Sequence, residues 1–141
     1  VLGQLHFLMR AGSGRVLHFD GTSWRVAAEG LRYANGINVN SARDRLYVAE
    51  TSGAALRLYD RDTATGVLRL DKIAPMGAAV DNINVDRSGA LWIAAHPKPL
   101  ALPTYRRTVD GRAPSLVLLY EDIAGAEPKE PISSSALIST S

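Results

Sequence analysis

Side chains that carry oxygen stand at two equivalent points of the sequence. Asp81 and Asn82 come just before an Ile-Asn-Val stretch at 83–85, and Asn35 comes just before the same stretch at 37–39. Superimposing 37–39 on 83–85, an offset of 46 residues, places Asn35 on Asp81. Carboxylate and amide oxygens are the ligands that hard cations such as Ca²⁺ prefer in proteins. The pattern therefore predicts a metal site formed by Asn35, Asp81 and Asn82.

The kind of metal follows from the kind of ligand. The sequence has no cysteine, which excludes a thiolate site, and an all-oxygen site favours calcium over zinc or copper. Two structural alternatives remain open. Asn35-Gly36 is also the pattern of a two-residue hairpin turn, and Asp81-Asn82 is also a pair that caps a strand by bonding its own backbone. The offset that the two points share favours the ligand interpretation.

Other candidate residues are less specific. His96 precedes Pro97 at the end of an expected strand, where it is either a catalytic or substrate-contacting residue or an ordinary loop residue. His6 and His18 fit ordinary strand positions, and Glu50 is expected to be a solvated strand end. Arg106-Arg107 is expected in a solvated loop.

The bulk composition excludes several classes of function. The chain has 141 residues, 46% hydrophobic and 21% charged, which is typical of one globular domain. A formal net charge of +2, with the basic residues scattered along the chain, argues against a nucleic-acid partner. No apolar run approaches the ~20 residues that a transmembrane helix needs.

The chain is organised as short alternating segments separated by turn residues, without the 3.6-residue period of helices. Repeats of roughly 46 residues, each with up to four short strands, are typical of propeller blades. We therefore expect an all-β chain of about two and a half four-stranded antiparallel blades, with residues 1–141 as part of a single β-propeller domain truncated at both ends. The expected strands are 15–19, 24–28, 37–40, 46–50, 55–59, 67–73, 82–85, 91–95 and 115–121.

Several of these motifs together resemble the paraoxonase/arylesterase family. They are Tyr33–Asn38, Leu46–Glu50, Val80–Asp86 and Leu91–Ile93 with its His96-Pro97 ending. The resemblance implies a six-bladed β-propeller with calcium in a central tunnel. It also implies hydrolysis of small-molecule aryl esters or lactones, by attack of water on a carbonyl that calcium polarises.

Residue by residue, the resemblance assigns Asn35, Asp81 and Asn82 to the catalytic calcium and places His96 near the active site. The family's remaining ligands and its histidine dyad lie upstream and have no counterpart in this chain, so we do not expect the 141 residues to be active alone. Ala95 stands where vertebrate members carry a cysteine.

Two other classes stay open, and the residues leave localisation and oligomeric state undetermined. The first is a gluconolactonase-like or strictosidine-synthase-like propeller enzyme. The second is a non-catalytic propeller that keeps calcium for structure and binds a partner. The resemblance, and nothing else in the sequence, favours a secreted or periplasmic protein.

Overall fold

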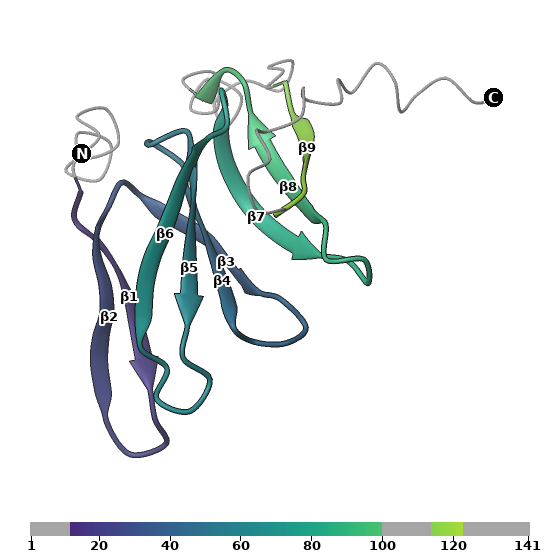
Figure 1. The fold of residues 1–141 in the computed structure, drawn as a ribbon. Coiled ribbons are helices and arrows are strands. Elements are labelled where there is room, and N and C mark those ends of the chain that lie inside the picture. The colour runs from purple at the N-terminus through teal and green to yellow at the C-terminus, as the bar shows by residue number, and fades with distance from the viewer. Residues whose placement is uncertain (1–11, 100–113, 123–141) are drawn as a thin grey trace.

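The computed structural model describes residues 12–99 and 114–122. Within these residues nine strands form three antiparallel sheets, and there is no α-helix (Figure 1). The strands are β1 (Gly14–Phe19), β2 (Trp24–Leu31), β3 (Ala34–Val39), β4 (Arg45–Glu50), β5 (Ala55–Arg61), β6 (Leu68–Pro75), β7 (Ala79–Val85), β8 (Leu91–His96) and β9 (Leu116–Tyr120).

The three sheets are consecutive meanders. The first sheet has the order β1-β2, the middle sheet β3-β4-β5-β6 and the third sheet β7-β8-β9. Short turns join consecutive strands from β1 to β8. In the first of them Asp20 Oδ1 accepts hydrogen bonds from the backbone N–H groups of Thr22 and Ser23, both at 2.8 Å. The prediction of an all-β chain of successive antiparallel blades is confirmed, with strand ends that differ from the expected ones by a few residues.

The middle sheet is covered on both faces. Residues 46–50 of β4 are all buried. One cluster, which includes Val48, packs against the first sheet, and the other, which includes Leu58, packs against the third sheet. Because fully burying one aliphatic side chain contributes about 1.5–3 kcal/mol, these two clusters hold the sheets face to face. Figure 1 shows the middle sheet between the other two.

The first and third sheets each leave one face uncovered in the described part of the chain. The exposed side chains of the first sheet include Leu17 and Val26, together with Phe19 and Trp24, whose rings stack with centroids 4.8 Å apart. On the third sheet Trp92 is exposed. Apolar sheet faces of this kind pack against another layer in folds built from stacked sheets.

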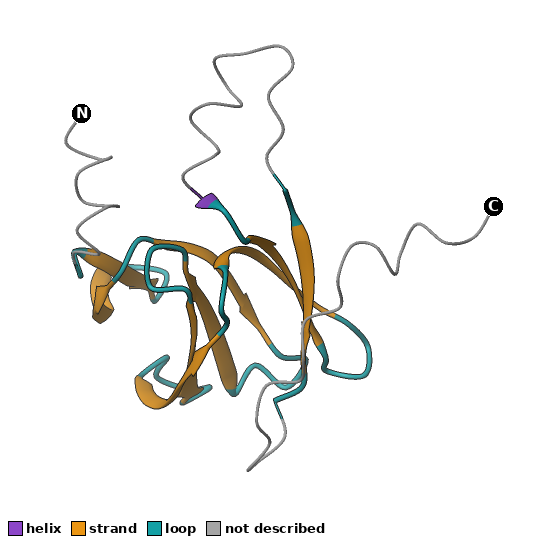
Figure 2. Cartoon of the chain, turned by 90° about the horizontal axis from the view of Figure 1, so that it is seen from above, coloured by secondary structure: helices purple, strands orange, loops and turns teal. Residues whose placement is uncertain are grey.

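Figure 2 views the chain from above and shows the strands with their connecting loops. Two sequence-based expectations lie outside the described residues and stay predictions: His6 as an ordinary strand residue and Arg106-Arg107 in a solvated loop. In the described residues no helix is long and apolar enough to cross a membrane.

Candidate functional site

Asn35 lies in a β-bulge within β3. Ala34 pairs with Glu50 and Ile37 with Val48, so three steps along β3 match two steps along β4. The extra residue falls at Asn35-Gly36, and Asn35 is exposed. The hairpin-turn alternative for Asn35-Gly36 is therefore wrong, because these residues lie inside a strand whose register changes there.

Asp81-Asn82 forms the same bulge in β7. Val80 pairs with Ala95 and Ile83 with Ile93, again three steps against two. The sequence predicts this pair at the entry to a strand, but it lies well inside one, because β7 already begins at residue 79. The two bulges are separated by the 46 residues that the sequence repeat indicated.

The two bulges lie against one another. A Cβ atom built on Gly36 would clash with the carbonyl oxygen of Asp81 and lie 3.0 Å from the Cα of Asn82. Gly36 has an ordinary negative φ, so it is needed here for close approach rather than for an unusual backbone conformation. The structure thus brings the strand that carries Asn35 against the Asp81-Asn82 backbone.

Two side chains from β3 and from the turn after β4 donate hydrogen bonds to β7, one on each side of its bulge. Asn38 Nδ2 donates to the carbonyl oxygen of Ile83 at 2.9 Å, and Thr51 Oγ1 donates to that of Val80 at 2.8 Å. Sequence reasoning missed both contacts. Asn38 stands in the repeated apolar-Asn-apolar motif, a signal that could have singled it out, whereas nothing in the sequence marks Thr51.

The side chains at the bulges offer oxygens that are not otherwise engaged. Asn35 and Asn82 are exposed, and neither side chain has a hydrogen-bond partner among the described residues. The Asp81 side chain is 29% exposed, and its recorded contact is with His96. In this part of the chain no three His, Cys, Asp or Glu residues cluster. One carboxylate with two amide oxygens suits calcium, which binds both kinds of oxygen.

His96 ends β8 and faces Asp81. Its Nε2 lies 3.7 Å from Asp81 Oδ2, within ion-pair range but longer than a hydrogen bond. The His96 side chain is 21% exposed, and Nδ1 is buried without a partner among the described residues. The structure therefore places His96 beside Asp81, with Nε2 directed to the Asp81 carboxylate.

Glu50 is not the solvated strand end that the sequence suggested. It is 2% exposed, and its Oε1 lies 3.0 Å from Arg57 Nη2 and accepts a hydrogen bond of 2.6 Å from the backbone N–H of Arg32. The cause is the middle sheet, which is covered on both faces and supplies Arg57 from the next strand. The Glu50 carboxylate is therefore already paired with a positive charge.

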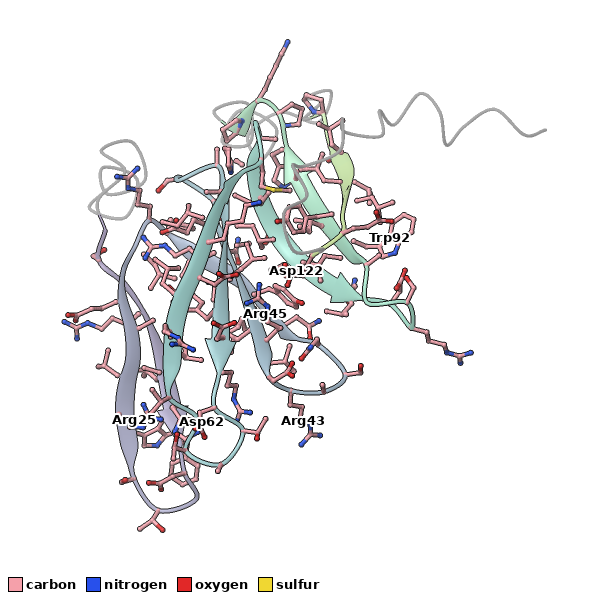
Figure 3. The ribbon with its side chains drawn as sticks, viewed as in Figure 1. Arg25, Arg43, Arg45, Asp62, Trp92 and Asp122 are labelled. Atoms are coloured by element: carbon pink, nitrogen blue, oxygen red, sulfur yellow. The ribbon has the colours of Figure 1, made fainter. Side chains whose placement is uncertain are left out.

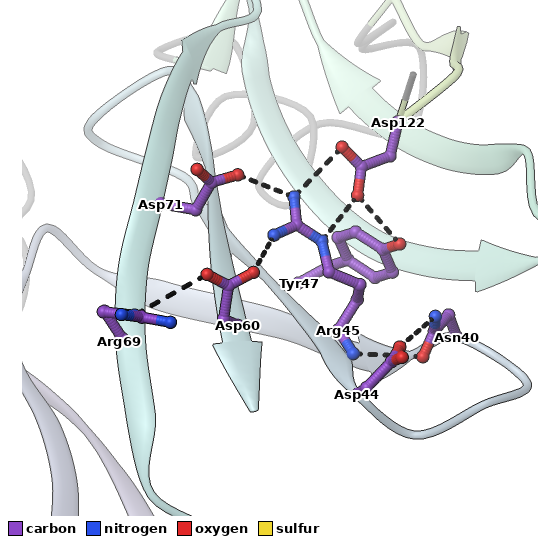
Figure 4. A network of polar contacts seen from close by, with 8 residues as sticks. All are labelled: Asn40, Asp44, Arg45, Tyr47, Asp60, Arg69, Asp71 and Asp122. Carbon is purple, nitrogen blue, oxygen red and sulfur yellow. Dashed lines mark hydrogen bonds and ion pairs between the residues drawn. The ribbon is translucent and has the colours of Figure 1, made fainter. Parts of the chain in front are cut away.

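A groove of about 880 Å³ lies at the other end of the strands, against the β3–β4 and β7–β8 turns. Its main feature is Arg45, which contacts the carboxylates of Asp60, Asp71 and Asp122 (Figure 4). Figure 3 shows Arg45 and Asp122 pointing toward one another between the middle and third sheets. These three carboxylates share the one guanidinium as a counter-charge. The groove is separate from the candidate site, because neither bulge nor His96 lines it.

The family model described as Arylesterase matches residues 1–134. The chain belongs to the arylesterase family. Among arylesterase relatives, human serum paraoxonase/arylesterase 1 is 33% identical over 117 residues, which cover 81% of this chain and 32% of that protein. Human serum paraoxonase/lactonase 3 is 27% identical over 115 residues, with the same coverage of 81% and 32%. This arylesterase chain thus spans about a third of the length of the curated relatives that it matches.

A solved structure of luciferin-regenerating enzyme resembles the arylesterase chain with a TM-score of 0.58. The similarity covers 86% of this chain and 36% of that chain, at 14% sequence identity. At this identity the likeness shows the fold alone, which is that of a β-propeller.

Proposed function

We propose that this chain carries part of the calcium site of an enzyme that hydrolyses aryl esters or lactones. The observation that carries the proposal is the pair of matched bulges in β3 and β7, where Gly36, the neighbour of Asn35, meets the Asp81-Asn82 backbone. Membership of a family whose relatives are named as arylesterases and lactonases supports the reaction class.

Asn35, Asp81 and Asn82 would hold the cation through their side-chain oxygens, and Asp81 would supply the one negative charge among them. Calcium, when bound, supplies Lewis-acid polarisation of the substrate carbonyl and stabilises the oxyanion that forms as water attacks. Because Asn35 and Asn82 are exposed and unpartnered in the described part of the chain, neither would need to give up a hydrogen bond to bind.

We assign His96 a proton-handling role at Nε2. This nitrogen is the one that faces the Asp81 carboxylate, at 3.7 Å, while Nδ1 is buried. A neutral imidazole accepts a proton from attacking water when it lies within hydrogen-bond reach of it. The assignment makes His96 necessary for turnover but not for binding of calcium.

The test is calorimetric titration of calcium into the full-length protein and its variants. Asn35→Ala and Asp81→Ala should weaken binding by more than about tenfold, or about 1.4 kcal/mol, and Asp81→Ala should also abolish hydrolysis of phenyl acetate and of a simple lactone. Asn84→Ala is the matched control, because Asn84 is an exposed amide on the same strand.

Each result bears on a different part of the proposal. If the wild type binds no calcium, or if neither Asn35→Ala nor Asp81→Ala changes the calcium affinity, the proposed calcium site is wrong. Binding that depends on Asp81 without hydrolysis of either substrate would instead indicate a calcium-stabilised binding module. His96→Gln should keep the calcium affinity and lose turnover.

A further inference from the structure

β7 is the edge strand of the third sheet, since the strand order is β7-β8-β9. Half of the carbonyl groups of an edge strand point away from the ladder and need partners elsewhere. In β7 two such carbonyls, those of Val80 and Ile83, immediately flank the Asp81-Asn82 bulge. Side chains of the middle sheet bind both of them.

Thr51 connects both halves of the candidate site. Its hydroxyl donates to the Val80 carbonyl at 2.8 Å, and its backbone N–H donates to the carbonyl of Tyr33, two residues before Asn35, at 3.0 Å. Thr51 is 8% exposed, and its hydrogen bond to Val80 is buried. Thr51 thus binds both the residue that leads into the strand of Asn35 and the strand that carries Asp81.

Asn38 and Gly36 complete the same junction on the other side. Asn38 Nδ2 binds the Ile83 carbonyl, while its Oδ1 accepts a hydrogen bond of 2.8 Å from the backbone N–H of Val39, which orients the amide. Between Asn38 and Asn35, Gly36 lets the two backbones meet where any side chain would clash with Asp81.

We propose that Gly36, Asn38 and Thr51 are positioning residues that set the separation between Asn35 and Asp81-Asn82, and with it the calcium affinity. We call these three residues the β3–β7 seam. The inference rests on the proposed function, since the seam acts on calcium only if the bulges bind it. Because a bulge interrupts the regular hydrogen-bond ladder between strands, contacts from the neighbouring sheet fix its position.

The physical basis is that Asn38 and Thr51 use their side-chain donors to bind backbone carbonyls of β7, while Gly36 lets the two backbones approach. Removal of the Thr51 hydroxyl leaves a buried carbonyl without its donor, which lets β7 move to find another partner. Partners that orient metal ligands typically change affinity by about 10–100-fold when they are removed. We therefore expect Thr51→Val to change calcium binding even though Thr51 contributes no ligand atom.

The experiment measures the calcium dissociation constant of the full-length protein by calorimetry, below the melting temperature of every variant. Thr51→Val keeps the branched shape and removes the donor, so it should weaken calcium binding by about tenfold or more. Thr51→Ser keeps the hydroxyl and should stay near the wild-type value. Ser52→Ala is the matched control, because Ser52 is also buried and its Oγ has no partner among the described residues.

A second pair of variants tests the seam if Thr51→Val fails to fold. Asn38→Ala should weaken calcium binding, whereas Asn84→Ala, at the equivalent position 46 residues later, should not. Melting temperatures in excess chelator report on stability alone. A purely structural seam would lower these melting temperatures and leave the calcium affinity of the folded variants unchanged, which would overturn the inference.

The two proposals fail in different ways. If the wild type binds calcium and Asp81→Ala abolishes binding, while Thr51→Val and Asn38→Ala bind as the wild type does, the seam inference alone is wrong. If the wild type binds no calcium, the proposed function is wrong and the seam inference is overturned with it.

Discussion

Arg45 in β4 and Asp122, just after β9, form a two-point ion pair that joins the middle sheet to the third sheet. Arg45 Nε lies 2.9 Å from Asp122 Oδ2 and Nη2 lies 3.1 Å from Oδ1, and Tyr47 donates its hydroxyl to Oδ2 at 3.2 Å. The side chains of Arg45 and Asp122 are 20% and 16% exposed. A planar guanidinium that binds a carboxylate at two points fixes orientation as well as distance.

Arg45→Met should destabilise the protein by about 1–3 kcal/mol, because it leaves Asp122, Asp60 and Asp71 without their shared counter-charge. Urea unfolding of the full-length protein measures the change. Arg69→Met is the matched control: Arg69 is 83% exposed and lies 3.7 Å from Asp60, so its loss should change stability by less than about 0.5 kcal/mol. Equal effects of the two substitutions would show that the Arg45 network adds nothing beyond a surface pair.

Ionisation of Tyr47 should lower the free energy of unfolding at alkaline pH. Burial and the nearby Asp122 carboxylate raise the pKa of the Tyr47 hydroxyl to about 12, from an ordinary value of 10.0. The folded state therefore holds this proton more tightly than the unfolded state does, so the free energy of unfolding falls as pH rises from about 10 to about 12. The loss should reach about 2–3 kcal/mol.

Urea unfolding of the wild type and of Tyr47→Phe between pH 9 and pH 12 measures this contribution. The phenylalanine variant lacks the ionising group, so its stability should fall less steeply over that range, and below about pH 9.5 the difference between the two proteins should be constant. Curves that stay parallel up to pH 12 would contradict the raised pKa of Tyr47.

Gly36→Ala should push β3 away from β7. Its Cβ would enter the space of the Asp81 carbonyl oxygen, and overpacking of this kind costs typically about 1–3 kcal/mol of stability. We expect calcium binding to weaken as well, because the added methyl group separates Asn35 from Asp81. Chemical unfolding in chelator and calorimetry measure the two effects.

Gly89→Ala is the control for Gly36→Ala. Gly89 has a φ of +90°, and an added Cβ would meet no atom within 4 Å. This substitution strains the backbone and should lower stability while leaving calcium affinity unchanged. If Gly36→Ala kept the wild-type affinity, close approach of β3 and β7 would not be a requirement of the site.

The sequence by itself determined the class of fold and the repeat. Alternating segments and turn residues are local features, so the strands that they predict appear close to their expected positions. The offset between Asn35 and Asp81 is also a property of the chain alone, and it identified two points that the structure shows to be equivalent bulges. The resemblance to the paraoxonase/arylesterase family likewise rested on short motifs that can be read without a structure.

Only the tertiary structure decided what surrounds those points. A bulge is a mismatch between two paired strands, so the sequence of one strand does not show it. The sequence predicts Asp81-Asn82 at a strand entry, whereas the pair lies within β7. Glu50 was expected in solvent but is buried against Arg57, because burial depends on sheets that come from elsewhere in the chain. The hydrogen bond of Thr51 arises in the same way: its partner, the Val80 carbonyl, lies 29 residues away in the sequence and reaches it only when the two sheets pack face to face.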